Sequence, residues 1–360
     1  MKNCLKLCAI TIAILSTPSY AVTYSIVDLG TLGGFYSGGR AVNDAGQVTG
    51  YGGNTYGTTD AFLYTNGAMT NLGQNYVGFS GLTIDGSIGL SINNSGHVVG
   101  STQITTDEGV STSRATYWAN GVGTDMGTLG GLYSHAASIN NSGQVVGAAS
   151  IANGQQRAFL YSNGSMQDLG NLGGTYSNAR SINDSGVIVG VADLANTEQH
   201  MFIYNNGVMQ DTGYAYAAPS AINNNNQIVG YTSYNAFIYE NGVLTNLNIA
   251  GLNQAYGINN QGQIVGWYDE SGGSAFLYEN GVASNLNDLI DPNSGWLLSV
   301  ALGINNFGWI TGVGTHNGQQ RAFLAYLDNT SAVPVPAALP LMLSGLGVLG
   351  VAARRRKNEG

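Results

Sequence analysis

The chain has 360 residues, of which 9% are charged and 54 are glycine, roughly double the usual share of glycine. Outside the two ends it carries five arginines against nineteen acidic residues, and this balance repels phosphate backbones, so we expect no nucleic-acid partner. Both cysteines, Cys4 and Cys8, lie in the first 21 residues, which excludes disulfides, zinc-thiolate sites and cysteine nucleophiles from the rest.

Residues 1–21 have the pattern of a signal peptide. Lys2 and Lys6 give a basic start, residues 7–15 are apolar, and Ser19-Tyr20-Ala21 has the small-residue spacing of a cleavage site. The apolar run is too short to span a bilayer. We therefore expect export with cleavage after Ala21, and the alternative is a buried first strand.

A nonamer of the form Ile-Asn-Asn-x-Gly-x-Val-Val-Gly recurs seven times, at intervals of 36 to 50 residues. Its copies begin at Val42, Ile92, Ile139, Ile182, Ile222, Ile258 and Ile304. Two further elements, of Ala-Phe-Leu-Tyr and Asp-Leu-Gly type, recur in phase with it. Repeats of this length indicate a propeller, a solenoid or an array.

Each repeat is expected to hold about four short strands. Residues 158–161 and 166–169 flank Asn163-Gly164, and an Asn-Gly pair between apolar runs is a strong hairpin signal. Six hairpins share this turn. A second hairpin is expected to turn at residues 183–186, whose types tolerate left-handed backbone geometry. Both faces of the strands are largely apolar, which suits a sheet packed between two neighbours.

The seventh repeat lacks its last strand, and the missing strand stands at the other end of the sequence. Residues 322–328 run on without an Asn-Gly turn, while the mature chain begins with the orphan segment 24–30. Pairing the first strand with the last would close a ring and protect its edges. We therefore predict an all-β fold, a seven-bladed β-propeller over residues 22–330, with an open β-solenoid as the alternative.

Three features follow the repeats. Residues 331–336 form a linker that carries, with Ala337, the motif Val333-Pro334-Val335-Pro336-Ala337. Residues 337–353 are uncharged and just long enough to be a transmembrane segment. Residues 354–360 begin with Arg354-Arg355-Arg356-Lys357, which the positive-inside rule places in the cytoplasm. This combination predicts a sorting signal that is recognised and cut, and the alternative is a permanent tail anchor.

This tail resembles the PEP-CTERM sorting tail of Gram-negative bacteria, in the variant written Val-Pro-Leu-Pro-Ala, and the repeats at 158–161 and 168–174 resemble the HAF family of extracellular repeats. The resemblance implies an exosortase-type membrane transpeptidase as a partner, transient anchoring in the inner membrane, and export to the cell surface or an exopolysaccharide matrix. Val335 stands where a glutamate is common, which leaves the exosortase type open. The repeat family implies an extracellular setting and no defined activity.

No pattern of residues predicts nucleophilic catalysis. The sequence has no Gly-x-Ser-x-Gly elbow. The four histidines are expected to be structural, with His97 in a turn, His200 just before a strand, and His135 and His316 in loops.

Acidic residues offer two further options. Glycoside hydrolysis needs two carboxyl groups about 5 to 10 Å apart, but the pairs Asp107-Glu108 and Asp269-Glu270 are expected to be solvated turns. The aspartates of the Asp-Leu-Gly register are expected to bind local backbone amides; they are Asp28, Asp125, Asp168 and Asp211. Asn43-Asp44 and Asn183-Asp184 offer oxygen ligands for calcium, and that option stays open.

Aromatic residues in segments that vary between repeats are the best signal of binding. They are Tyr51, Tyr56, Tyr76, Tyr214, Tyr216, Tyr234 and Trp296. We expect them to pack within loops, and the alternative is stacking on sugars.

Seven similar units without a singular polar cluster predict a non-enzymatic binding or scaffolding protein that has no cofactor, with an extracellular polysaccharide as a candidate ligand. The alternative is a secreted propeller-type polysaccharide lyase or glycosidase, in which one repeat would break the pattern with convergent charges. The insertion at residues 73–89 is the most irregular segment, and Asp85 is its only charged residue. That weighs against the enzyme.

Overall fold

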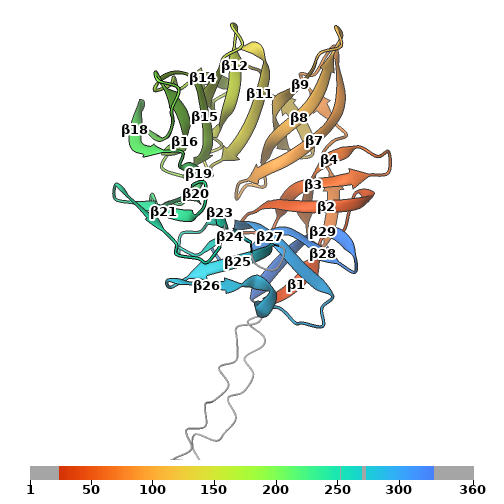
Figure 1. Ribbon diagram of the computed structural model, residues 1–360. Coiled ribbons are helices and arrows are strands. Elements are labelled where there is room, and N and C mark those ends of the chain that lie inside the picture. Colours follow the sequence, from red (N-terminus) through yellow and green to blue (C-terminus); the bar gives the residue numbers. More distant parts are fainter. Residues whose placement is uncertain (1–23, 252, 270–272, 328–360) are drawn as a thin grey trace, which may run out of the picture. The chain divides into compact units, whose positions relative to one another are not determined.

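The computed structural model describes residues 24–251, 253–269 and 273–327. Its strands form seven antiparallel sheets in a ring, which is the predicted seven-bladed β-propeller (Figure 1). Successive blades follow one another in chain order, and the first strand of each blade lines the axis. In this part of the chain no helix has the length and apolarity needed to cross a membrane.

Five blades contain four strands that run from the axis to the rim in chain order. Blade 1 has β2 (Gly33–Val42), β3 (Val48–Asn54), β4 (Thr59–Thr65) and β5 (Ala68–Asn71). Blade 3 has β11 (Gly130–Ile139), β12 (Val145–Ile151), β13 (Gln156–Ser162) and β14 (Ser165–Asp168). Blade 4 has β15 (Gly173–Ile182), β16 (Ile188–Leu194), β17 (Gln199–Asn205) and β18 (Val208–Ala215). Blade 5 has β19 (Ala218–Ile222), β20 (Ile228–Tyr231), β21 (Ala236–Glu240) and β22 (Val243–Asn246). Blade 6 has β23 (Asn253–Ile258), β24 (Ile264–Tyr268), β25 (Ser274–Glu279) and β26 (Val282–Asn285), followed by the 3-10 helix η1 (Leu286–Leu289).

Blade 2 has five strands because the insertion at residues 73–89 adds one. Its strands are β7 (Leu82–Ile92), β8 (Val98–Thr106), β9 (Ser111–Ala119), β10 (Val122–Asp125) and the added β6 (Tyr76–Val77). The short β6 lies parallel to β10 at the outer edge of the sheet. The irregular segment of the sequence is therefore an extra rim strand.

Blade 7 is built from both ends of the described chain. It contains β27 (Trp296–Ile304), β28 (Ile310–His316), β29 (Gln319–Leu327) and β1 (Tyr24–Asp28). The first strand, β1, pairs antiparallel with β29, from Tyr24 opposite Leu327 to Asp28 opposite Phe323. The predicted closure is confirmed, and the open solenoid is excluded. In Figure 1 the red β1 lies in the same blade as the blue β28 and β29.

The core consists of seven hydrophobic clusters, one at each junction between neighbouring blades. The phenylalanine of the Ala-Phe-Leu-Tyr element is fully buried in six blades, as Phe62, Phe159, Phe202, Phe237, Phe276 and Phe323. Each sheet therefore buries both faces, because it is packed between two others.

Turn chemistry fixes the hairpins. The six Asn-Gly turns predicted between the third and fourth strands of a blade have positive φ at both residues, as at Asn163 (52°) and Gly164 (78°). The second hairpin of blade 4 turns at residues 183–186, as predicted, and Gly186 has a positive φ of 80°. Blade 5 places Asn226 (61°) at that position instead of glycine.

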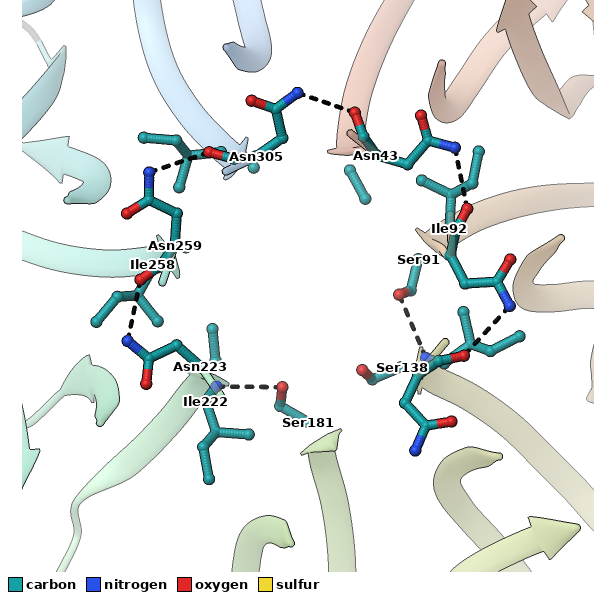
Figure 2. A pocket seen from close by; sticks show the side chains of 18 of the residues that line it. Asn43, Ser91, Ile92, Ser138, Ser181, Ile222, Asn223, Ile258, Asn259 and Asn305 are labelled. Atoms are coloured by element: carbon teal, nitrogen blue, oxygen red, sulfur yellow. Dashed lines mark hydrogen bonds between the residues drawn. The ribbon is translucent and has the colours of Figure 1, made fainter. Parts of the chain in front are cut away.

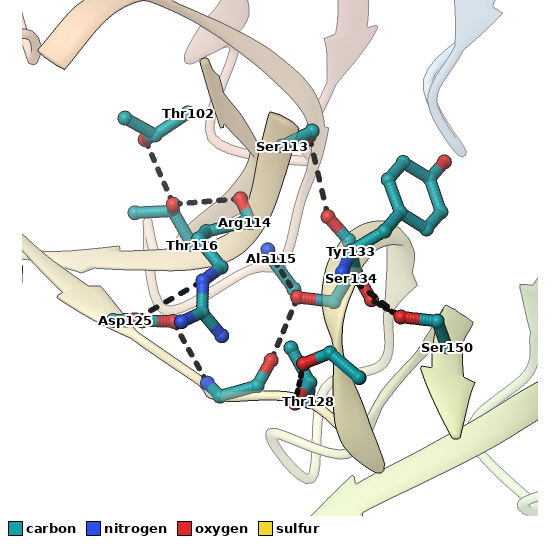
Figure 3. A network of polar contacts seen from close by, with 12 residues as sticks. Thr102, Ser113, Arg114, Ala115, Thr116, Asp125, Thr128, Tyr133, Ser134 and Ser150 are labelled. Atoms are coloured by element: carbon teal, nitrogen blue, oxygen red, sulfur yellow. Dashed lines mark hydrogen bonds and ion pairs between the residues drawn. The ribbon is translucent and has the colours of Figure 1, made fainter. Parts of the chain in front are cut away.

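Buried serines add a polar bond between blades (Figure 3). The backbone N–H of Ala115, in β9, donates to Ser134 Oγ in β11 at 2.9 Å, and this hydroxyl donates to the carbonyl of Gly127 at 2.7 Å. The same bond from an alanine N–H reaches Ser37, Ser87, Ser177 and Asn253 at four other junctions. These bonds satisfy backbone donors that would be costly to bury alone.

Candidate functional site: the axial cavity

A cavity of about 280 Å³ lies on the propeller axis, and all seven blades contribute to its wall (Figure 2). Each blade supplies the end of its first strand and the two residues that follow. The nonamers of the sequence therefore converge on one site. It has three layers, described in turn below.

The inner belt is the ring formed by the first asparagine of each nonamer. Its members are Asn43, Asn93, Asn140, Asn183, Asn223, Asn259 and Asn305, each no more than 4% exposed. Each Nδ2 donates to the backbone carbonyl of the next member, at 2.9 to 3.2 Å, and Asn305 donates to Asn43 to complete the circle (Figure 2). Each Oδ1 accepts turn amides of its own blade, as Asn93 does from Ser95 and His97. One amide thus holds a turn and a junction together.

The outer belt is formed by the residue after each inner-belt asparagine. Its members are Asp44, Asn94, Asn141, Asp184, Asn224, Asn260 and Asn306. Each backbone N–H donates to the Oδ1 of the next member, at 2.9 to 3.1 Å, and Asn306 donates to Asp44. This second circle is also closed.

The two aspartates of the outer belt are held by amide groups on both sides. Asp44 Oδ2 accepts from the side chains of Asn94 and Asn306, both at 3.0 Å. Asp184 Oδ2 accepts from Asn141 (3.0 Å) and Asn224 (2.8 Å). Burial raises the pKa of Asp184, but the hydrogen bonds from Asn141 and Asn224 outweigh it and leave the pKa below its usual value. Asp184 is therefore ionised at neutral pH.

The third layer is a set of β-bulges, one in every inner strand, at the residue three before the inner-belt asparagine. The bulged residues are Arg40, Leu90, Ala137, Arg180, Ser220, Tyr256 and Leu302, and all seven line the cavity. Bulges re-aim a side chain relative to the regular pleat. The belts contain only asparagine and aspartate, whereas this layer has five residue types, so most of the chemical variation in the wall lies here.

Sequence reasoning missed this layer, although a signal was present. The position two residues before the nonamer is occupied, over the seven repeats, by five different residue types. Variation at a fixed place in a repeat indicates a site that the fold does not constrain.

The histidines have structural partners, but three of them lie on strands where the sequence placed them elsewhere. His200, expected just before a strand, lies on β17 and contacts Asp211 at 2.9 Å. His135 lies on β11 and shares a hydrogen bond of 2.8 Å with the Tyr133 hydroxyl. Burial, followed by the charge of Arg180, lowers the pKa of His135 to about 4. His316 ends β28, where its Nδ1 lies 2.8 Å from Asp28 Oδ2 and its ring stacks on Trp296 at 4.6 Å. Strands β11 and β28 extend beyond the apolar runs that mark them in the sequence, so these two histidines are not in loops.

The aspartates of the Asp-Leu-Gly register bind backbone amides, as predicted. Asp28, Asp125, Asp168 and Asp211 each accept from the glycine two residues later, at 2.8 Å. Three of them also have a basic neighbour on the adjacent strand: Arg114, His200 or Arg321. The aspartates of this register therefore have a structural role.

The other acidic candidates do not form a site. Asp107, Glu108 and Asp269 are exposed, and Glu270 lies outside the described residues. Within the ranges that the structure describes, no group of three or more His, Cys, Asp or Glu side chains is placed to hold a metal ion. Asp44 and Asp184, the calcium candidates, are bound by amides of the outer belt.

The variable aromatic residues divide into two groups. Tyr76 packs edge-on against Phe79, Trp296 stacks on His316, Tyr214 packs edge-on against Tyr239, and Tyr51 lies near Tyr36; for these, packing is confirmed. The others are exposed: Tyr56 (87%), Tyr216 (64%) and Tyr234 (69%), so the packing expectation was wrong for them.

The predicted processing sites lie outside the described residues. These are the cleavage site at Ala21, the motif Val333-Pro334-Val335-Pro336-Ala337, the apolar segment 337–353 and the basic end Arg354-Arg355-Arg356-Lys357.

Residues 332–357 match the PEP-CTERM protein-sorting motif. This motif implies an exported protein directed to the cell surface, and exosortase-type membrane enzymes recognise such signals. A comparison of the sequence with curated proteins gives no match.

Several solved structures are similar to this chain. The propeller domain of the Trilobed protease from Pyrococcus furiosus is 9% identical, with 89% of this chain and 99% of that chain covered and a TM-score of 0.51. TolB from Acinetobacter baumannii is 13% identical over 65% of this chain, at a TM-score of 0.42, and this chain spans 61% of TolB. The gluconolactonase XC5397 from Xanthomonas campestris is 8% identical, with 87% and 94% covered, at 0.40. Only the first of these three has a TM-score above 0.5, and at 9% identity that likeness shows the fold alone.

Proposed function

We propose, from the sorting motif matched at residues 332–357, that this chain is exported, cut at its tail by an exosortase-type enzyme, and displayed as a non-enzymatic binding or scaffolding propeller. Its setting is the cell surface or the exopolysaccharide matrix of a Gram-negative bacterium, where it takes the role of a HAF-type repeat protein. The observation that carries the proposal is the motif together with the closed propeller that precedes it.

The state of the cavity carboxylates supports binding over catalysis. A glycosidase needs one carboxyl group free to donate a proton and a second free to act as nucleophile or base. Asp44 and Asp184 instead accept hydrogen bonds from asparagine side chains on both neighbouring blades. Their charge therefore serves to hold three blades together.

The intact mass of the protein, taken from fractionated cells of its source, tests the processing. We expect the loss of residues 1–21 and of the residues beyond about 333, with the product in the surface or matrix fraction. A mass that retains Arg354–Lys357 would overturn tail processing.

The non-enzymatic role has a separate test. The product is incubated with acidic and neutral polysaccharides, and new reducing ends and unsaturated sugars are measured. We expect none, and turnover that is lost in Asp44→Asn or Asp184→Asn would establish the competing lyase or glycosidase.

A further inference from the structure

The described part of the chain contains five arginines, and three of them have partners away from the cavity. Arg114 lies 3.9 Å from Asp125, and Arg321 lies 3.8 Å from Asp28. Arg157 donates to the carbonyl of Thr175 at 2.8 Å. Arg40 and Arg180 form no hydrogen bond or ion pair with any described residue, and both line the axial cavity.

For Arg40 this isolation is costly. Arg40 Nε is buried without a hydrogen-bond partner, and its guanidinium carbon lies 5.5 Å from the centre of the Tyr51 ring. A cation over an aromatic face recovers part of the lost hydration, but it does not satisfy the N–H donors. A buried donor left unsatisfied costs about 1–3 kcal/mol. The fold thus carries a penalty at this position that a surface arginine would not have.

The two arginines occupy equivalent bulges in blades 1 and 4, on different sides of the seven-membered ring. Each is followed four residues later by an outer-belt aspartate, Asp44 or Asp184. Neither arginine forms an ion pair with its aspartate, whose oxygens accept belt amides instead. The carboxylates of Asp44 and Asp184 therefore leave the guanidinium groups of Arg40 and Arg180 free to bind a ligand.

We propose that the axial cavity binds a small carboxylate-bearing ligand, of about one sugar residue in size, through the guanidinium groups of Arg40 and Arg180. Arginine matches a carboxylate with two parallel N–H···O bonds, so a ligand would satisfy the donors that the protein leaves open. This deepens the proposed binding role and rests on it.

The volume of the cavity and the charge of the protein limit which ligands fit. A volume of about 280 Å³ lies just below the range of about 300–1,000 Å³ that holds drug-sized ligands. The acidic chain, with an isoelectric point near 4.7, and the belt carboxylates disfavour a multiply charged anion. A single carboxylate, from a free organic acid or from a uronic-acid residue of a polysaccharide, fits both limits.

Titration calorimetry on the full chain in mild detergent tests this. The probes are glucuronate, glucose as the neutral sugar, a short uronate oligomer and inorganic sulfate. We expect a carboxylate probe to bind and glucose to give no heat. Preference for the monomer would indicate a free acid or chain end, and preference for the oligomer a polysaccharide segment. Equal binding of glucose or sulfate, or no binding of either carboxylate probe, would overturn the proposal.

Variants locate the site. Arg40→Gln and Arg180→Gln should each weaken binding about 10-fold or more, because each removes hydrogen bonds to a charged group. Arg157→Gln makes the same charge change outside the cavity and should bind as wild type does. If Arg157→Gln weakens binding as much as Arg40→Gln, the attraction is unspecific and the proposal fails.

Melting temperatures show whether a variant that loses binding is still folded. Arg40→Gln should melt at or above the wild-type temperature, because it removes a buried donor without a partner. A carboxylate probe should raise the melting temperature of wild type but not of Arg40→Gln. If a variant does not fold, the upward shift of wild type with glucuronate, absent with glucose, still decides the case. Loss of binding in a correctly processed protein would overturn this inference alone, whereas binding followed by turnover would overturn only the non-enzymatic role.

Discussion

Two adjacent residues in each nonamer, one in the inner belt and one in the outer belt, form different hydrogen bonds between neighbouring blades. The inner-belt asparagine uses its amide for a neighbouring carbonyl and its oxygen for its own turn, while the outer-belt residue accepts a neighbouring N–H. An aspartate can replace asparagine in the outer belt, as Asp184 does, because both flanking amides can donate to it. Two adjacent aspartates would leave one bond without a donor, so we infer that the belt tolerates them only when they are separated.

At the same scale, His135 makes stability depend on pH. Its pKa is about 4 in the fold and about 6.5 in the unfolded chain, so the unfolded state binds more protons between these values. The stability from neutral His135 is therefore complete above pH 6.5 and is lost as the pH falls toward 4, by at most about 3 kcal/mol. Urea unfolding of wild type and His135→Gln at several pH values measures it. The variant should lose less stability on acidification, and parallel curves would contradict the assignment.

Among the elements, the bulged inner strand explains the last glycine of the nonamer. A Cβ on Gly50 would lie 2.0 Å from the carbonyl oxygen of Gly38 in the bulged strand, and the six equivalent glycines have the same conflict at 2.0 to 2.1 Å. Two residues further along β3, a Cβ on Gly52 would find its nearest atom at 3.4 Å.

Gly50 and Gly52 provide a matched test of the conflict with the bulged strand. Gly50→Ala should lower the free energy of unfolding by about 1–3 kcal/mol, because the backbone must shift to relieve the overlap. Gly52→Ala, on the same strand, should change it by less than about 1 kcal/mol. Urea unfolding of both variants checks this, and equal effects would show that strand propensity, not the bulge, determines the cost.

The elements that could be predicted from the sequence are those with local causes. Asn163-Gly164 specifies its own turn, and the orphan strand at residues 24–28 could be matched to a repeat that lacked one. The bulge at Arg40 could not be predicted, since an extra residue in a strand leaves no periodic signal. Neither could β6, because two residues in an insertion are too few to show alternation.

The axial cavity could not be predicted from the sequence for a different reason. The belts join residues 36 to 50 positions apart, or 262 apart where the ring closes, and the repeat shows that these residues are equivalent but not that they touch. Arg40 and Arg180 differ from their equivalents in the sequence, yet only the ring places them in one cavity.

At the scale of the whole molecule, the ring closes at the junction between blades 7 and 1. Blade 7 differs from the others because it combines the last three strands with β1, the first strand of the described chain. At the rim the two chain ends pair within blade 7, where β1 lies on β29, and at the axis blades 7 and 1 are joined by Asn305, which donates to the carbonyl of Asn43 at 2.9 Å. Asn93 makes the same bonds at an internal junction: one to a neighbouring carbonyl and two from its own turn. Both asparagines are 4% exposed. The two therefore differ in whether their junction closes the ring.

Alanine substitution at these positions tests whether the ring behaves as a continuous belt. Asn93→Ala and Asn305→Ala should each lower the free energy of unfolding by about 1–3 kcal/mol, because each leaves a buried carbonyl and two turn amides without a partner. In a closed ring the two losses should agree within about 0.5 kcal/mol. Urea unfolding of the full chain measures both. A clear loss in Asn93→Ala with none in Asn305→Ala would mean that blades 7 and 1 separate in solution, and that the axial cavity has a side opening there.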